Sequence, residues 1–224
     1  MATITVGSDF EAPRVMPGSG LQDIRLTDRD VLLARTDLPA RNFSVANPQA
    51  AVFANHVGIC VPATGCPDDA GPIRVERGRV SVDATLRGRT ARVVSTHLEP
   101  AAPPIRLQQA GELVAGPLNT ALPTVLLGDL NSAPGTPPHN ALLTAGFTDA
   151  WAATRPRDPG FTCCQDANLR NTTSKLTRRI DYVLFRGNVT TLTTNQVGAT
   201  QADRTPSGLW PSDHAGVRSV LRLR

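Results

Sequence analysis

The stretch RVSVDATLRGRTARVVST, residues 79–96, decides the class of fold that this sequence predicts. In residues 79–86 apolar and polar side chains alternate, which is the period-two pattern of a half-buried strand. The turn signal Arg87-Gly88 follows, and residues 90–96 form a second strand-like run. The stretch therefore predicts an antiparallel hairpin.

Short strands separated by turns continue along the chain, with few helices. Residues 123–127 (PTVLL) are wholly apolar, which predicts a strand buried on both faces. Helix formers and a following Gly-Pro stop predict a helix over residues 105–115. Residues 46–77 read as loops, and the first 20 residues show no convincing element. The remaining predictions are strands at 31–35, 180–185 and 217–223, a helix at 139–145, and a strand followed by a long loop within 190–210.

Length and composition predict a single mixed α/β domain over residues 1–224 in which strands dominate. The chain has 224 residues, and roughly 100–200 residues make one domain. No stretch of about 18 apolar residues occurs, which excludes a transmembrane helix. The start lacks the basic and apolar regions of a secretory signal, so the chain as written predicts a cytoplasmic protein.

Charge and cysteines leave several alternatives open. The net charge is +4, which suits an anionic partner, but the arginines are scattered and aromatic residues make up only 4%. This composition does not favour duplex DNA as that partner. Cys60 and Cys66 could close a small disulfide loop, and Cys163 and Cys164 could pair with partners elsewhere; four free thiols are the other reading.

Polar residues capable of chemistry gather at predicted strand ends. They lie in four fragments: STHLE at 95–99, LLGDLNS at 126–132, RRIDYVLF at 178–185 and WPSDHAGV at 210–217. Each fragment alone has an ordinary structural reading as a satisfied histidine, a turn or a helix cap. Four such placements in one domain rarely arise by chance, so together they indicate a functional site. The candidate residues are His97, Asp129, Asn131, Asp181, Asp213 and His214.

These residue types suit one kind of chemistry. Asp129, Asp181 and Asp213 would repel one another unless a cation or a protonated histidine lay among them. Oxygen ligands select a hard cation, so we expect Mg²⁺, or Mn²⁺ or Ca²⁺. Imidazoles and an amide add a proton shuttle and donors to a phosphoryl oxygen. The set predicts hydrolysis of a phosphate ester by a metal-activated water.

The motifs STHLE, GDLNS, RIDYVLF and PSDH, in this order, resemble those of the endonuclease/exonuclease/phosphatase superfamily, whose fold is that of deoxyribonuclease I. The resemblance covers roughly residues 21–224. It implies an α/β (α+β) fold of two packed, mostly antiparallel β-sheets flanked by helices, a four-layer α/β/β/α sandwich. The stretches LTDRDVLLAR and GFTCC further resemble bacterial, often exported members, which opposes the cytoplasmic reading.

The resemblance also implies roles on the substrate side. His97 would contact the scissile phosphate and assist charge development or protonation of the leaving group. Asp129 would orient or deprotonate the attacking water and help to bind the metal. Asn131 would hold that water or a phosphoryl oxygen. The substrate would be a phosphate ester in a nucleic acid, a lipid headgroup or a small phosphodiester, with no obligate protein partner.

The remaining roles concern the second histidine and the cation. Asp181 would hydrogen-bond His214 and fix its tautomer. His214 would act in general acid–base catalysis or stabilise the phosphate. Asp213 would bind the divalent metal.

The sequence departs from the family pattern at its start. The family's first strand ends in an asparagine and a later strand in a Gln-Glu pair whose glutamate is the principal metal ligand. Only Glu11 and Glu76 precede the STHLE motif, and neither fits. We therefore expect a domain that misses its first strands and has weakened activity; the alternative is a non-catalytic remnant that binds phosphate or a partner. Asp28 and Asp30 are weaker candidates for substitute ligands, because LTDRD also reads as a loop before a strand.

Overall fold

The structure is a computed structural model that describes residues 2–16, 20–59 and 73–224. Strands dominate, as the sequence predicts, and three α-helices accompany them in the described residues. The elements are β1 (Ala2–Met16), β2 (Gly20–Leu33), β3 (Phe43–Val52), β4 (Val57–Ile59), β5 (Ile73–Val75), β6 (Gly78–Leu86), β7 (Arg89–His97), α1 (Pro103–Ala115), β8 (Thr124–Asp129), α2 (Pro137–Thr144), β9 (Thr148–Asp149), α3 (Ala150–Thr154), β10 (Asp181–Arg186), β11 (Val189–Val197), the short 3₁₀ helix η1 (Gln201–Asp203) and β12 (Gly216–Leu223).

A six-stranded sheet forms the centre of the molecule, in the order β3-β6-β7-β8-β10-β9. The predicted hairpin is confirmed as β6 and β7, which pair antiparallel from Arg79 opposite Thr96 to Leu86 opposite Arg89. Strands β7 and β8 run parallel, and the crossover between them carries α1. The other pairs in this sheet are antiparallel.

Strand β8 is apolar throughout because both of its faces are covered. Leu126 points to a cluster formed with Leu113 of α1 and Leu142 of α2. Val125 points to the opposite cluster, which includes Val189 of β11. The prediction from PTVLL is therefore confirmed.

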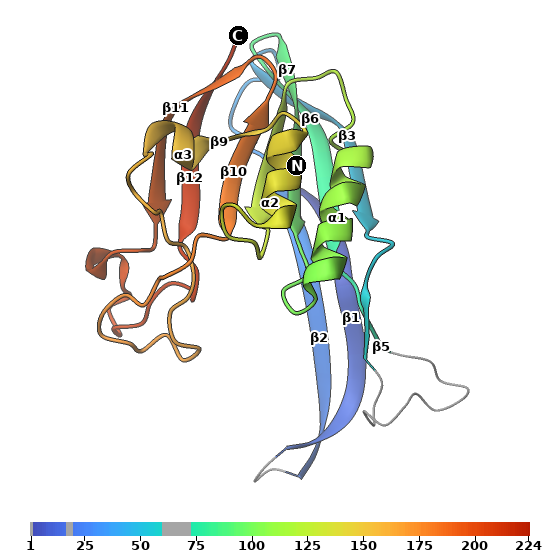
Figure 1. The fold of residues 1–224 in the computed structure, drawn as a ribbon, viewed down its shortest axis with the longest axis vertical. Helices are drawn as coiled ribbons and strands as arrows, with labels where there is room; N and C mark the ends of the chain where they lie inside the picture. Colours follow the sequence, from blue (N-terminus) through green and yellow to red (C-terminus); the bar gives the residue numbers. More distant parts are fainter. Residues whose placement is uncertain (1, 17–19, 60–72) are drawn as a thin grey trace.

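The ribbons β1–β2 and β11–β12 pack beside the central sheet and complete a mixed α/β fold (Figure 1). Helices α1 and α2 lie in front of the sheet in this view, and β11 and β12 lie beside β10 on the left. The long β1–β2 ribbon contacts β3, β6 and β7 and extends below the sheet. Apolar side chains of β12 and β10 join the β11–β12 ribbon to the sheet: Val217, Leu221, Leu223, Val183 and Phe185.

Several sequence predictions are wrong in detail. The first 20 residues hold β1, which was not predicted because Gly7-Ser8 and Pro13 interrupt its alternation; the register of the β1–β2 pair shifts between Val6 and Ser8. The LTDRD segment is part of β2 rather than a loop. The supposed loop over 46–77 contains most of β3 and all of β4 and β5.

The adjacent cysteines are bonded to each other. A disulfide joins Cys163 to Cys164, whereas the sequence suggested remote partners or free thiols. A bond between neighbours depends on local backbone conformation, which a spacing pattern does not reveal. The other predicted pair, Cys60 and Cys66, lies outside the described residues.

Candidate active site

The ends of three adjacent strands bring the first candidate residues together. In the sheet register His97, the last residue of β7, lies opposite Asp129, the last residue of β8. Asp129 in turn lies opposite Asp181, the first residue of β10. The Nε2 atom of His97 is 3.5 Å from Oδ2 of Asp129. The alternation of parallel and antiparallel pairs thus places three polar side chains at one edge of the sheet.

His214 reaches the same edge from the loop before β12. Its backbone forms an isolated β-bridge with Cys163, and its Nδ1 lies 2.9 Å from Oδ2 of Asp181. This contact with Asp181 raises the pKa of His214 above its ordinary value, although partial burial opposes the shift. The pair is the one that the family resemblance implies. Asp181 fixes the orientation of the ring and favours its charged form.

Asp129 lies at the centre of the group. Burial raises the pKa of its carboxyl above the ordinary value, and the neighbouring charge of Asp181 raises it further. One ligand atom each of Asp129, Asp181 and His214 all lie within 4.8 Å of one another. A divalent cation here would offset the repulsion between the two carboxylates, and carboxylate ligands suit Mg²⁺ or Mn²⁺. The residues present therefore fit a divalent metal.

Asn131 supports Asp129 through its backbone. Its N–H donates to Oδ1 of Asp129 at 2.7 Å, and its side-chain amide donates to the carbonyl of Leu98 at 2.8 Å. The residue has a φ of 47°, in the left-handed region that asparagine tolerates better than most residues. Asn131 is thus held beside the site by both of its amide groups.

Asp213 lies next to the site but outside the three-residue group. Its side chain is exposed and accepts a hydrogen bond from Ser212 Oγ at 3.3 Å. Its charge adds to the causes that raise the pKa of His214. In this structure Asp181, rather than Asp213, shares the potential cation group with Asp129.

Sequence reasoning gave little weight to Asp28, which the structure places beside His97. Asp28 Oδ1 is 3.8 Å from Nδ1 of His97, and its Oδ2 accepts from Arg77 Nη1 at 2.6 Å. The pKa of Asp28 is lowered, first by its interaction with His97 and then by the charge of Arg77, despite partial burial. The signal was the acidic LTDRD motif, but only the β2–β7 contact shows which histidine it meets.

Two buried carboxylates lie behind this pair. Asp30 is 5% exposed, and burial followed by the charge of Asp28 raises its pKa to about 7. Glu99 is 2% exposed, and its Oε2 lies 3.7 Å from Nε of Arg77. Arg77 therefore stands between the acids of β2 and the acid that follows β7.

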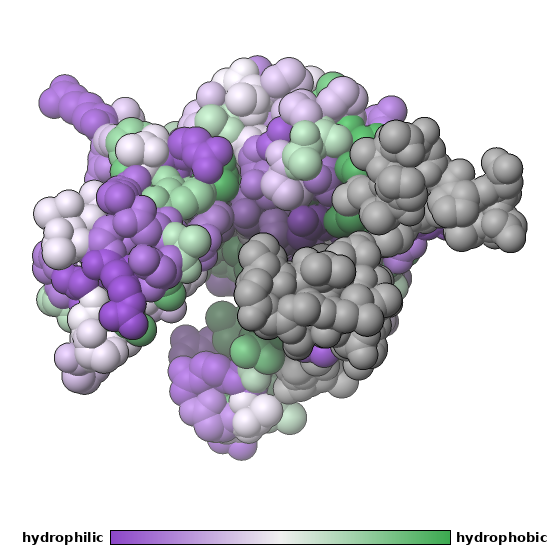
Figure 2. All heavy atoms as spheres, turned by 90° about the horizontal axis from the view of Figure 1, so that it is seen from below, coloured by the Kyte–Doolittle hydropathy of each residue, from purple (hydrophilic) through white to green (hydrophobic). Residues whose placement is uncertain are grey.

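The face that carries these strand ends mixes hydrophilic and apolar residues where the structure describes it (Figure 2). Seen from below, the molecule is hollowed in the middle of this face, and the residues in the hollow are mostly hydrophilic (Figure 2). The exposed fractions of the side chains are 33% for His97 and 26% for His214. Both imidazoles are accessible to a ligand from solvent.

The family model described as the Endonuclease/Exonuclease/phosphatase family matches residues 20–214. The chain belongs to this family. It is a family of metal-dependent phosphoester hydrolases, which includes nucleases and phosphatases. No curated protein sequence shows significant similarity to the chain.

Solved structures of low sequence identity share the fold. An endonuclease/exonuclease/phosphatase from Bacteroides vulgatus is 15% identical with a TM-score of 0.62, over 97% of this chain and 76% of that one. A mannosyl-6-phosphatase from Bacteroides thetaiotaomicron is 14% identical with a TM-score of 0.59, over 96% and 76%. TDP2 of D. rerio, complexed with a single-strand DNA product, is 15% identical with a TM-score of 0.58, over 99% and 85%.

Within residues 2–16, 20–59 and 73–224, no helix has both the length and the apolar character that a membrane span requires.

Proposed function

We propose that the chain hydrolyses phosphate esters with the help of a divalent cation, at the site formed by His97, Asp129, Asp181 and His214. One observation carries the proposal. Ligand atoms of Asp129, Asp181 and His214 lie within 4.8 Å of one another, and His97 approaches the same Asp129 carboxylate at 3.5 Å.

The carboxylates and imidazoles divide the proton transfers between them. Asp129, which is held in place by the backbone N–H of Asn131, accepts the proton of the attacking water. His214, whose pKa is raised by Asp181, carries a proton that it donates to a phosphoryl or leaving-group oxygen. His97 donates to the phosphate from the other side of Asp129, with Asp28 and Arg77 holding its ring.

Asp129 and Asp181 would hold the cation. The family resemblance also implies Asp213 as a ligand, although this residue lies outside the group in the structure. A bound Mg²⁺ or Mn²⁺ supplies positive charge against the phosphoryl oxygens. The family's upstream glutamate has no counterpart among these residues. We therefore propose weak turnover rather than the full rate of the family.

Small and lipid phosphoesters are the substrates that we propose to test first. The mannosyl-6-phosphatase and the TDP2 complex with DNA show that proteins of this fold act on very different phosphate compounds. Aromatic residues are few here, which offers little stacking surface for unpaired bases.

The test measures hydrolysis of bis(p-nitrophenyl) phosphate and of p-nitrophenyl phosphate with Mg²⁺, with Mn²⁺ and with EDTA. We expect cation-dependent turnover that Asp129→Asn and His214→Gln each lower by a factor of about 100 or more. The matched control is Asp37→Asn, because Asp37 is an exposed aspartate that pairs with Arg35. Activity that survives both site substitutions contradicts the proposal.

A further inference from the structure

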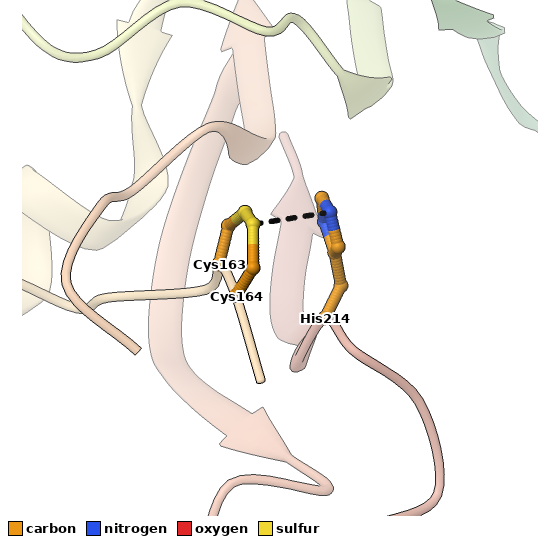
Figure 3. A group of neighbouring side chains, drawn as sticks. All are labelled: Cys163, Cys164 and His214. Atoms are coloured by element: carbon orange, nitrogen blue, oxygen red, sulfur yellow. Dashed lines mark hydrogen bonds between the residues drawn. A yellow bond between two sulfur atoms is a disulfide. The ribbon is translucent and has the colours of Figure 1, made fainter. Parts of the chain in front are cut away.

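The disulfide between Cys163 and Cys164 lies directly against the ring of His214. Figure 3 shows the disulfide beside the imidazole, with a dashed line from one sulfur to the ring. Cys164 Sγ is 3.9 Å from Nε2 of His214. The β-bridge between Cys163 and His214 holds the two segments together at this point. The sulfurs and the imidazole therefore meet by virtue of the backbone pairing.

We propose that reduction of this disulfide creates a site for a thiophilic cation such as Zn²⁺, with Cys163, Cys164 and His214 as ligands. Ligand atoms of these three residues lie within 4.8 Å of one another. Around a tetrahedral Zn²⁺, a thiolate sulfur and an imidazole nitrogen are roughly 3.6 Å apart, given their usual bond lengths. The distance of 3.9 Å between Cys164 Sγ and His214 Nε2 is close to this value. The two sulfurs must separate to roughly 3.8 Å once their bond is broken, if both are to bind one ion.

The surroundings of His214 suit a metal ligand. Its Nδ1 is hydrogen-bonded to Asp181 at 2.9 Å, which leaves Nε2 turned toward the sulfurs. Histidines that bind metals usually donate their other ring N–H to a carboxylate in this way, which orients the ring and makes it a better ligand. Arg178 Nη2 lies 3.3 Å from both sulfurs and places positive charge beside them, which favours anionic sulfur at this position. Two sulfur ligands and one nitrogen ligand favour Zn²⁺ over Mg²⁺.

A dithiol can act as the reductant that opens the disulfide. The dithiol transfers two electrons and two protons, the bond between Cys163 Sγ and Cys164 Sγ breaks, and the dithiol becomes a cyclic disulfide. Binding of the cation then releases both thiol protons to solvent, together with the proton on Nε2 where the imidazole is charged. A cation on Nε2 occupies the nitrogen of His214 that Asp181 leaves free. The binding site stands independently of the proposed hydrolysis, but one consequence rests on it: the reduced, Zn²⁺-loaded protein would lose that activity.

The binding test uses Co²⁺ as a spectroscopic probe of thiolate ligation. Cys60 and Cys66 are first changed to serine, so that thiols there contribute nothing. The protein is reduced with dithiothreitol, freed of it under argon and titrated with Co²⁺; the same protein left oxidised is the control. We expect a thiolate-to-cobalt charge-transfer band that saturates at one equivalent, is absent from the oxidised protein and disappears after Cys164→Ser.

Further outcomes test whether His214 is a ligand and distinguish failure of the cation site from failure of the proposed function. His214→Ala should weaken Co²⁺ binding at least tenfold; a band of unchanged affinity removes the imidazole from the site and overturns the proposal. A reduced protein that shows no band overturns it without any variant that might misfold. If the band appears but no phosphate ester is hydrolysed under any condition, the proposed function fails and the site stands. If hydrolysis occurs, micromolar Zn²⁺ should inhibit the reduced protein at least tenfold more strongly than the oxidised one, and equal inhibition overturns the proposed loss of activity.

Discussion

His214 lies between a carboxylate and a disulfide. Its Nδ1 contacts Asp181, its Nε2 faces a disulfide, and both neighbouring charges, Asp181 and Asp129, favour the imidazolium form. Asp181→Asn should therefore lower the pKa of His214 toward its ordinary value, because the largest cause of the shift is removed. A titration of the imidazole signals by NMR measures this change directly.

The matched control for that titration is Asp213→Asn. Asp213 acts on His214 only through its charge and is the last of the causes that raise the pKa. Its substitution should move the titration midpoint of His214 much less than Asp181→Asn does. Equal shifts in the two variants would mean that the hydrogen bond at 2.9 Å does not determine the protonation of His214.

Asp30 links the acids of β2 to the pH dependence of stability. Its folded-state pKa is about 7 against an ordinary value of 3.8, because burial and the charge of Asp28 disfavour the carboxylate. The folded state therefore binds the proton more tightly than the unfolded state. The resulting stabilisation is fully present below the ordinary pKa and is lost as the pH rises through about 7.

Asp30→Asn should remove this loss. The free energy of unfolding of the variant, relative to that of the natural sequence, should increase as the pH rises from 4 to 8. At pH 8 this increase should reach up to about 4 kcal/mol. Urea unfolding at both pH values measures the difference. A gain that is the same at pH 4 and pH 8 would show that the charge of Asp30 is not its cause.

At the scale of the elements, the approach of β7 to β8 depends on one glycine. Gly128 has a φ of +140°, and a Cβ on it would lie 1.9 Å from the carbonyl oxygen of Thr96. Gly128→Ala must push the two strands apart one residue before Asp129. We expect a loss of more than about 2 kcal/mol in the free energy of unfolding, measured by urea denaturation.

Gly135→Ala separates the close contact from backbone strain. Gly135 also has a positive φ, +84°, but a Cβ there would meet nothing within 4 Å. This variant should cost only the left-handed strain, about 1 kcal/mol. If the two alanines are equally destabilising, crowding between β7 and β8 is not the reason that position 128 holds glycine.

The elements also show which parts of the fold a sequence can predict. Strands β6, β7 and β8 were predictable because their patterns follow directly from burial on one face or on both. The pair β9–α3 was missed, because a strand of two residues (Thr148–Asp149) is too short to show a period. In that segment Asp149 accepts the N–H groups of Trp151 and Ala152 as an N-cap, which is a weak local signal for a helix of one turn.

The site was predictable only as far as its motifs extend. The structure brings Asp129, Asp181 and His214 into one group. Their sequence fragments could be recognised because each one lies at the end of a strand. Asp28 was not assigned to His97, because that neighbourhood depends on how the β1–β2 ribbon packs on the sheet. The contact between Cys164 and His214 likewise comes from a β-bridge between segments 50 residues apart, which no local pattern encodes.

At the scale of the whole molecule, the site connects parts that pack separately. Its side chains come from β7, β8, β10 and the loop before β12, and the β1–β2 ribbon adds Asp28. A cation that binds Asp129 and Asp181 binds only when these parts are assembled. Cation binding must then stabilise the fold as a whole, by about 2.7 kcal/mol when the cation is at 100 times its dissociation constant.

Thermal unfolding with and without Mg²⁺ tests this coupling. Mg²⁺ should raise the Tm of the natural sequence, while an equal ionic strength of NaCl should not, and EDTA should reverse the increase. Asp129→Asn should differ from the natural sequence both in its stability without the cation and in the stability that the cation adds. Without the cation it should be at least as stable as the natural sequence, because it removes a buried charge that Asp181 repels. With Mg²⁺ it should gain little, because a ligand is lost. An equal increase in Tm in both proteins would place the bound cation elsewhere on the molecule and separate it from the strand-end acids.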